Sequence, residues 1–380
     1  MARSIYLHVP FCPHICPYCD FHKMRRNEGL VARYLDRLEQ EALAQAERHP
    51  GRPDTVYFGG GTPSHLSDAE LERVVAVLDR DFGFPGRLET TLEADPLTFT
   101  PDRLARFRDL GFDRLSIGLQ STQDEVLRYL GRVHDGRAGL QALDWALASG
   151  LRVNADVITA VPGQDAELDL RTVAGTGVEH MSVYTLTVEP GTPFALRGVT
   201  VDSEREADDF ELVAGALAPF GLERYEVSNF ARPGQESRHN LGTWRGETYL
   251  GLGPSASSYL PEGSPFGTRL RNPSMRAWLE GAAPERELLG PEDVVLERLL
   301  TGLRTREGVD LAALERRTGR TPAAMAPRWW RDALRHRLLS VDGDRLRATD
   351  AGLARLDALL RSFVRAPWAH TVSAHAERGP

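Results

Sequence analysis

The sequence contains very little cysteine. Only Cys12, Cys16 and Cys19 occur in 380 residues, and all three lie within eight consecutive positions. An odd, clustered set of this kind cannot form a disulfide framework, which needs pairs of cysteines in a small secreted domain. The three thiols are therefore metal ligands, redox-active groups or chance neighbours.

Long apolar runs and blocks of like charge are also missing. No segment approaches the roughly 20 apolar residues that span a bilayer, and the residues after Arg3 lack the pattern of a cleavable leader. The formal net charge is -8, with 54 acidic and 46 basic residues and no basic stripe. This balance argues against nucleic acid as a partner. We expect a cytoplasmic protein with no transmembrane segment.

Six short β-rich runs alternate with segments of helical spacing in the first half of the chain. The runs cover residues 4–9, 54–59, 88–94, 114–119, 152–158 and 180–187. Such alternation predicts a parallel sheet joined by right-handed crossovers. Six units fall short of the eight that close a full barrel, so the pattern favours an open α/β fold, a partial TIM-like (β/α)6 barrel. A doubly wound sheet is the alternative.

The second half of the chain is less regular. A helix is expected near 203–219, a Pro/Gly-rich linker at 261–273 and a hairpin at 338–346 around an Asp-Gly-Asp turn. The predicted organisation is a partial barrel at 1–200, an extension at 201–280 whose His-Asn loop packs on the barrel, a smaller helical, winged-helix-like domain at 281–365, and a disordered tail at 366–380.

The cysteine segment, Cys12-Pro-His-Ile-Cys16-Pro-Tyr-Cys19, directly follows the first predicted strand. It therefore lies at the carboxyl end of a barrel strand, where this architecture places its chemistry. Three thiolates on one loop suit three irons of a 4Fe-4S cluster, which normally takes four cysteines. Because the chain has no fourth cysteine, the last iron is open or takes another ligand.

Zinc is an alternative for the cysteine segment, because His14 lies within it and His8 and His22 lie close to it in the sequence. Zinc sites usually draw on two ligand pairs separated in sequence, and no second cysteine pair exists here. Inert thiols are the third possibility.

The run YLHVPFCPHICPYCDF, residues 6–21, resembles the cluster motif of the radical S-adenosylmethionine (SAM) superfamily. Within it the run is most similar to the branch of oxygen-independent coproporphyrinogen III oxidases and HemW-type heme chaperones. The resemblance extends in ordered blocks through Ala256 and more weakly to about residue 363. It implies a 4Fe-4S cluster on Cys12, Cys16 and Cys19, with SAM on the open iron.

The resemblance also implies SAM contacts at positions near the ends of the predicted strands. The matching positions are Tyr6, Tyr18, Gly60, Gly61, Thr62, Glu93, Gln120, Arg132, Asp156 and Thr187. Glycines permit close backbone approach to a ligand, a guanidinium suits the methionyl carboxylate, and an acidic residue suits the ribose hydroxyls. A tight turn, a packing role or a surface role is the alternative at each position.

Three features separate the two branches. The oxidase pattern has a fourth cysteine where this chain has Phe21, and it has a long segment ahead of the cluster, which we expect to be absent here. The run from Arg238 to Trp244 resembles the H-N-x-x-Y-W segment of the chaperone branch, with Thr243 in place of Tyr. His239 is therefore a candidate axial heme ligand, because imidazole commonly ligates heme iron. A loop histidine bonded to the backbone is the alternative.

The resemblance favours a HemW-type heme chaperone that binds heme, SAM and a 4Fe-4S cluster, and transfers heme to an acceptor protein. An electron donor is a second expected partner; the sequence identifies neither protein. Radical decarboxylation of coproporphyrinogen III by the oxidase reaction is the enzymatic alternative. A radical SAM enzyme with another substrate is a third possibility, since a fold does not fix a function.

Overall fold

Alternating strands and helices build the amino-terminal half of the protein. The computed structural model describes residues 2–83, 88–366 and 368. Six strands run parallel and pair in chain order: β1 (Ser4–Val9), β4 (Thr55–Gly60), β5 (Glu89–Ala94), β6 (Arg114–Gln120), β7 (Arg152–Thr159) and β8 (His180–Thr185). Each predicted strand agrees with the observed one to within two residues.

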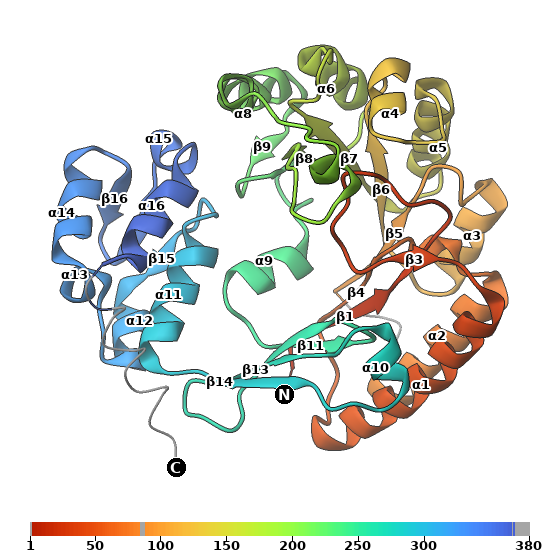
Figure 1. The fold of residues 1–380 in the computed structure, drawn as a ribbon, viewed down its shortest axis with the longest axis horizontal. Helices are drawn as coiled ribbons and strands as arrows, with labels where there is room; N and C mark the ends of the chain where they lie inside the picture. Colours follow the sequence, from red (N-terminus) through yellow and green to blue (C-terminus); the bar gives the residue numbers. More distant parts are fainter. Residues whose placement is uncertain (1, 84–87, 367, 369–380) are drawn as a thin grey trace.

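The strand order decides between the two expected architectures. A doubly wound sheet reverses its order at a switch point, whereas these strands follow one another without reversal. Helices cover the outer face of the curved sheet (Figure 1). They are α1 (Glu28–Arg48), α2 (Asp68–Phe82), α3 (Pro101–Asp109), α4 (Asp124–Tyr129), α5 (Gly136–Ala148), α6 (Ala166–Gly175) and α8 (Ser203–Leu217). The fold is the expected open (β/α)6 barrel.

Short strands from the second half of the chain extend this sheet at both ends. β11 (Tyr249–Leu252) pairs parallel with β1, and β12 (Ser257–Leu260), β13 (Thr268–Arg271) and β14 (Glu285–Leu288) continue antiparallel from it. At the other end, β10 (Asn229–Ala231) pairs antiparallel with β8. The edge strand β9 (Glu223–Arg224) pairs antiparallel with β10.

Two expectations for this region are wrong. The segment 261–273 contains strand β13 in place of a linker, because its backbone pairs with both neighbouring strands. The His-Asn segment is helix α9 (Arg238–Trp244) in place of a loop. The Ser237 hydroxyl caps this helix by accepting a hydrogen bond from the Asn240 N–H.

The carboxyl-terminal unit has its own hydrophobic core. Its helices are α11 (Pro291–Gly302), α12 (Leu311–Thr318), α13 (Pro322–Met325), α14 (Pro327–Arg335), α15 (Asp350–Leu353) and α16 (Leu356–Val364). The predicted hairpin is confirmed as β16 (Leu339–Asp342) and β17 (Arg345–Ala348), which β15 (Val309–Asp310) completes. The expected disordered tail, 366–380, lies outside the described residues apart from Ala366 and Trp368.

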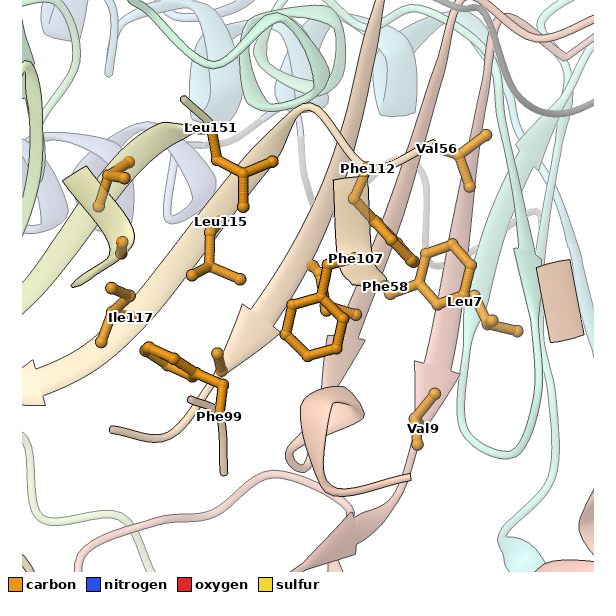
Figure 2. Packing of buried hydrophobic residues seen from close by; sticks show 14 of the residues in the cluster. Leu7, Val9, Val56, Phe58, Phe99, Phe107, Phe112, Leu115, Ile117 and Leu151 are labelled. Atoms are coloured by element: carbon orange, nitrogen blue, oxygen red, sulfur yellow. The ribbon is translucent and has the colours of Figure 1, made fainter. Parts of the chain in front are cut away.

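The two faces of the barrel sheet carry different side chains. On the outer face Phe58 packs edge-on against Phe112, with ring centroids 4.9 Å apart, and Phe107 lies beside them (Figure 2). Each fully buried side chain of this size contributes roughly 1.5–3 kcal/mol. Neighbours alternate between faces along a strand, so Leu92 belongs to this core while Glu93 lines a cavity inside the barrel. The apolar layer thus supports a polar interior.

Across the described part of the chain, the helices are either too short or too polar to span a membrane.

Candidate functional site

A cavity of about 410 Å³ opens at the carboxyl ends of the barrel strands, beneath the cysteine loop. Most of the residues expected at the site meet there: Cys12, Cys16, Tyr18, Cys19, Gly60, Gly61, Thr62, Glu93, Gln120, Arg132, Asp156 and Thr187. Tyr6 and His239 are not part of its lining. The chain therefore brings together residues from the ends of β1, β4, β5, β6 and β7.

The cysteine loop is held at both ends. Its first residues form β2 (Phe11–Cys12), which pairs in parallel with β3 (Met24–Arg25), and the ring of Phe11 is fully buried in the core. Between these strands the prolines and short turns keep the backbone irregular, with one hydrogen bond from Cys19 N to Cys16 O at 3.3 Å. All three thiols are free and face the same cavity.

The three thiols differ in their electrostatic surroundings. Burial raises the pKa of Cys12 to about 11 and also raises the pKa of Cys19. Burial acts in the same direction on Cys16, but His14 and Arg132 outweigh it and lower the pKa of that thiol. Since thiolates are the ligating form, Cys16 is the cysteine most readily deprotonated before metal binds.

The glycine segment after β4 is shaped by its neighbours. Gly60 has a φ of 109°, and a Cβ at that position would lie 2.4 Å from the His8 ring. A Cβ on Gly61 would lie 2.7 Å from the Pro10 backbone. The main chain also bonds to the start of the cysteine loop, from Gly61 N to Val9 O at 2.8 Å. These glycines therefore allow two backbone segments to approach at the cavity wall.

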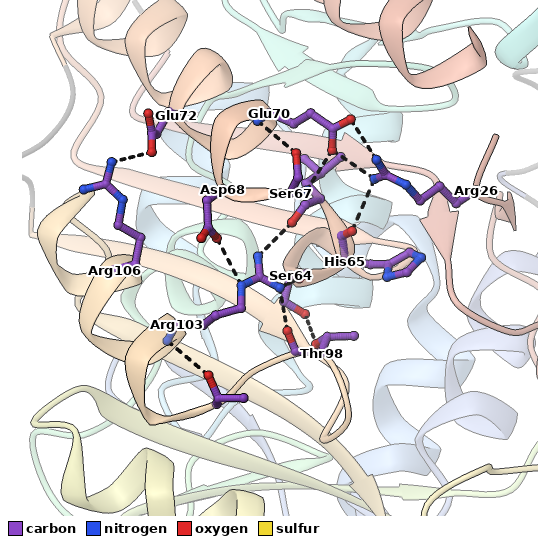
Figure 3. Close-up of polar contacts among 12 residues, drawn as sticks. Arg26, Ser64, His65, Ser67, Asp68, Glu70, Glu72, Thr98, Arg103 and Arg106 are labelled. Atoms are coloured by element: carbon purple, nitrogen blue, oxygen red, sulfur yellow. Dashed lines mark hydrogen bonds and ion pairs between the residues drawn. The ribbon is translucent and has the colours of Figure 1, made fainter. Parts of the chain in front are cut away.

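A network of arginines fixes the turn that follows, η1 (Pro63–His65) (Figure 3). Arg103 on α3 donates to the carbonyls of Ser64 at 3.0 Å and Thr98 at 2.6 Å. Arg26, just after the cysteine loop, donates to both carboxylate oxygens of Glu70 at 2.9 Å. The network ties β4, α2 and α3 to the cysteine loop, and so holds the lining residue Thr62 in place.

Arg132 is buried with a carboxylate partner and a sulfur neighbour. Its Nη2 donates to Asp95 Oδ2 at 2.7 Å and to the Gly118 carbonyl at 2.8 Å, and its Nη1 donates to Cys16 Sγ at 3.5 Å. The arginine and Asp95 side chains are only 8% and 5% exposed. Among the residues that the structure describes, neither its Nε nor the ring nitrogens of His14 in the same cavity have a hydrogen-bond partner. These free polar atoms leave capacity for a polar ligand beside the thiols.

Two carboxylates stand inside the barrel below the loop. Glu93 accepts from the Tyr57 hydroxyl at 2.8 Å and from Gly60 N at 3.0 Å, and Asp156 accepts from Asn154 Nδ2 at 2.8 Å. Burial raises the pKa of Glu93 to about 7, and it also raises the pKa of Asp156. Both can accept hydrogen bonds from ligand hydroxyls, and Glu93 changes charge near neutral pH.

Gln120 ends β6 with a strained backbone. Its φ of 69° lies in the left-handed region, and the pairing of β6 with β7 shifts register between Gly118 and Gln120. A bulge of this kind re-aims a side chain at the end of a strand. Here it brings Gln120 to the cavity lining.

Tyr6 lies near the cavity without lining it. Its ring stacks on Tyr57 at 6.1 Å and its hydroxyl lies 3.1 Å from His8 Nδ1. Tyr6 therefore supports the residues around the cavity.

The candidate heme ligand His239 lies apart from the cavity, and its side chain is enclosed elsewhere in the fold. The residue is 6% exposed, and its Nδ1 lies 2.9 Å from Thr55 Oγ1. The backbone N–H of His239 donates to Glu89 Oε1 at 2.9 Å. Thr55 and Glu89 begin β4 and β5, so His239 lies at the amino-terminal end of the barrel, opposite the cysteine loop. These contacts hold the histidine against β4 and β5, and heme ligation by His239 stays a prediction.

Sequence reasoning did not anticipate how three residues shape the site. Asp95 holds Arg132, His14 faces the cavity, and Lys23 lines it and donates to the Cys19 carbonyl. Composition could have singled out Lys23, because it is the only lysine among the 46 lysine and arginine residues of the chain. The pairing of Asp95 with Arg132 depends on the tertiary fold.

The donor set fits a 4Fe-4S cluster. Three free thiols share one cavity with a guanidinium that donates to a sulfur, and hydrogen bonds to the sulfur ligands are common around such clusters. Within residues 2–83, 88–366 and 368, no group of three His, Cys, Asp or Glu side chains is close enough together to hold a single metal ion. A single zinc ion would need its ligands gathered about 2.0–2.3 Å from one point. Three cysteines that serve three different irons need not converge so closely.

Comparison with known proteins finds two matching family models and several relatives that are similar over most of the chain. Residues 6–171 match the radical SAM superfamily, and residues 289–355 match the HemN C-terminal domain. The chain is 36% identical to heme chaperone HemW of Mycobacterium tuberculosis (strain ATCC 25618 / H37Rv), over 95% of this chain and 94% of the relative. It is 33% identical to heme chaperone HemW of Bacillus subtilis (strain 168), over 86% and 89%.

A solved structure shares the fold. Coproporphyrinogen III oxidase (HemN) from Escherichia coli, a radical SAM enzyme, aligns with a TM-score of 0.82 at 24% identity, covering 95% of this chain and 89% of that one. At that identity the likeness establishes the architecture of the barrel and of the carboxyl-terminal unit.

Proposed function

Because the chain belongs to the HemW family of radical SAM proteins, we propose that it is a heme chaperone that binds heme, SAM and a 4Fe-4S cluster, and passes heme to an acceptor protein. The observation that carries the proposal is the similarity to curated heme chaperones over most of the chain, at 31–36% identity. The cavity supports the cofactor part, because it joins three free thiols to polar groups suited to SAM.

Each group of the cavity has a role in this proposal. Cys12, Cys16 and Cys19 hold the cluster, which supplies an open iron when bound. Arg132, oriented by Asp95, binds the methionyl carboxylate through its remaining donor capacity. Glu93 and Asp156 accept hydrogen bonds from the ribose hydroxyls.

The oxidase alternative lacks a feature of its own pattern. The position of the fourth cysteine holds Phe21, whose side chain lines the cavity and is 66% exposed. The structural likeness to the coproporphyrinogen oxidase concerns the fold and does not favour its reaction. We also place the protein in the cytoplasm, since three free thiols are typical of a reducing compartment.

The test compares two activities in one preparation. Anaerobically reconstituted protein is titrated with hemin, and the heme-loaded form is mixed with a heme-free acceptor such as apomyoglobin while the Soret band is followed. In parallel, coproporphyrinogen III is incubated with the protein, SAM and dithionite. We expect saturable heme binding, transfer to the acceptor and no loss of coproporphyrinogen III. Conversion to protoporphyrinogen IX without a stable Soret band would transfer the assignment to the oxidase reaction.

A further inference from the structure

A second cavity, of about 200 Å³, lies apart from the cysteine loop. Its walls come from α9, the outer strands β11–β13, and helices α11 and α12 of the carboxyl-terminal unit, and it shares no lining residue with the first cavity. Its polar lining includes Tyr259, Arg269, Glu297, Arg298, Thr301 and Arg317. It is smaller than the roughly 300–1,000 Å³ pockets that enclose drug-sized ligands. Its size suits a small ligand.

Two arginines of this cavity have no carboxylate partner within the part of the chain that the structure describes. Arg298, which is half-buried, donates to the Trp244 carbonyl at 2.7 Å and to Thr301 Oγ1 at 2.9 Å. Arg317, at the exposed edge, donates to the Tyr259 hydroxyl and to the Phe266 carbonyl. All of these acceptors are neutral, so both guanidinium charges remain uncompensated.

The carboxylates beside the third arginine of the lining are already paired with it. Arg269 is paired with Glu287 at 2.7 Å and contacts Glu297. The lining therefore carries three guanidinium groups and one carboxylate, a surplus of positive charge. Burial, and next the charge of Arg317, lower the pKa of Arg298. Partly buried cations without a counter-ion are unfavourable, and an anion between them would relieve the repulsion.

We propose that this cavity binds a small oxyanion of the carboxylate or phosphate class, held by Arg298 and Arg317. A guanidinium presents paired N–H donors that match both kinds of oxyanion, and the hydroxyls of Tyr259 and Thr301 lie in the same lining. A bound anion would join α11 and α12 to the outer strands of the main sheet. This site is independent of heme, so its test and that of the proposed function fail separately.

The experiment is calorimetric titration of the full-length reconstituted protein with phosphate, pyrophosphate and malonate in a chloride buffer of constant ionic strength. We expect saturable binding of at least one oxyanion; the phosphate and malonate arms identify its class. Arg317→Gln should weaken that binding about tenfold or more, since a charge-assisted hydrogen bond is lost. Arg298→Gln should do the same. The matched control is Arg316→Gln, which replaces an exposed arginine next to Arg317 on α12 and should leave the affinity for the anion unchanged.

Two results would overturn the anion site. One is the absence of saturable binding for all three anions. The other is equal affinity in the wild type, Arg317→Gln and Arg316→Gln. Arg317 lies at the exposed edge, so its variant remains informative even if Arg298→Gln perturbs folding, which circular dichroism and thermal melting monitor.

Lys23 carries a second, independent inference. Lys23 is the only lysine of the chain, beside 45 arginines. It lines the cluster cavity, and its Nζ donates to the Cys19 carbonyl. It forms no ion pair with a carboxylate within the described ranges, although Asp20 lines the same cavity, so its positive charge is not tied to a partner and faces the cysteine loop. A nearby positive charge favours the more negative, reduced form of an iron–sulfur cluster. We infer that Lys23 raises the reduction potential of the bound cluster.

The test is a redox titration of reconstituted protein followed by electron paramagnetic resonance. In Lys23→Met the ratio of reduced to oxidised cluster at a fixed potential should fall about tenfold, which is 59 mV for one electron. Lys23→Arg should keep most of the wild-type potential, because it keeps the charge. Arg25→Met removes an exposed charge two residues away and serves as the control. An unchanged midpoint in Lys23→Met with an intact cluster spectrum would overturn the inference.

Discussion

Arg132 Nη1 lies 3.5 Å from Cys16 Sγ, so a guanidinium from the segment just after α4 faces the central cysteine of the cluster loop. The same side chain is anchored by Asp95 at 2.7 Å. Arg132 and Asp95 belong to two different strand–helix units, and burial of both side chains keeps their contact fixed. Arg132 therefore belongs both to the electrostatics of the thiols and to the proposed SAM site.

Loss of one thiol tests the cluster ligands. Cys16→Ser should abolish the broad iron–sulfur absorption of anaerobically reconstituted protein, because an alcohol at that position is a poor ligand for cluster iron. The barrel should stay folded, since Cys16 is only partly buried and lies outside the hydrophobic core. Iron and sulfide analysis with circular dichroism measures both effects. Purification of wild-type protein with stoichiometric zinc and no sulfide would contradict the cluster assignment.

Loss of the guanidinium tests the SAM site. Arg132→Leu should weaken SAM binding roughly tenfold to a hundredfold, the effect of losing about 1.5–3 kcal/mol of charge-assisted hydrogen bonding. Asp95→Asn should give a smaller loss, because it orients Arg132 and does not itself bind the ligand. Arg128→Leu removes an exposed arginine from α4, four residues before Arg132, and is the control. Equal SAM affinities in calorimetry, with the cluster intact, would remove Arg132 from the site.

Much of the fold was predictable because it rests on local patterns. The six parallel strands are short apolar runs bounded by turns, and each is followed by a stripe of leucine or valine at helical spacing. Residues that end such strands necessarily share one edge of the sheet, which explains why Glu93, Gln120 and Asp156 meet the cysteines. The edge strands β11–β14 were harder to predict, because four-residue strands among glycines and prolines carry almost no periodic signal.

The rest of the site depends on contacts between distant positions. Nothing local marks Asp95 as the partner of Arg132, since 37 residues separate them. The same holds for His239, which Glu89 reaches across 150 residues of sequence. A histidine followed by asparagine resembles a ligand-binding loop, and only the fold shows that Ser237 and Glu89 cap a helix there.

The raised pKa of Glu93 predicts a pH-dependent stability. Glu93 has a pKa of about 7 in the folded protein against an ordinary value near 4.5, so between those values the folded state holds the extra proton. Stability then falls as the pH rises from about 5 to 8. In Glu93→Gln this contribution is absent. The urea midpoint of the variant, relative to that of the wild type, should therefore increase as the pH rises across that range. The exposed Glu47→Gln is the control; parallel pH profiles for wild type and Glu93→Gln would contradict the prediction.

Replacement of His239 separates a structural role from heme ligation. The ring is enclosed by Tyr57, at 5.1 Å between centroids, and by Thr55, and it lies at the far end of the barrel from the cysteine loop. We therefore expect His239→Ala to bind hemin with an unchanged Soret band, and to lose about 1–3 kcal/mol of unfolding free energy from the broken hydrogen bond and unpaired Thr55 hydroxyl.

The titration of His239 adds a second measurement to the same experiment. Burial lowers the pKa of the ring to about 4, so the unfolded chain, with an ordinary value near 6.5, binds the proton first. The wild type should lose stability as the pH falls from 6.5 towards 4. His239→Gln, which keeps an amide for Thr55 but cannot titrate, should show a flatter profile, whereas the exposed His336→Gln should not. A weakened Soret band in His239→Ala with unchanged urea stability would instead mean that His239 leaves its pocket and ligates heme.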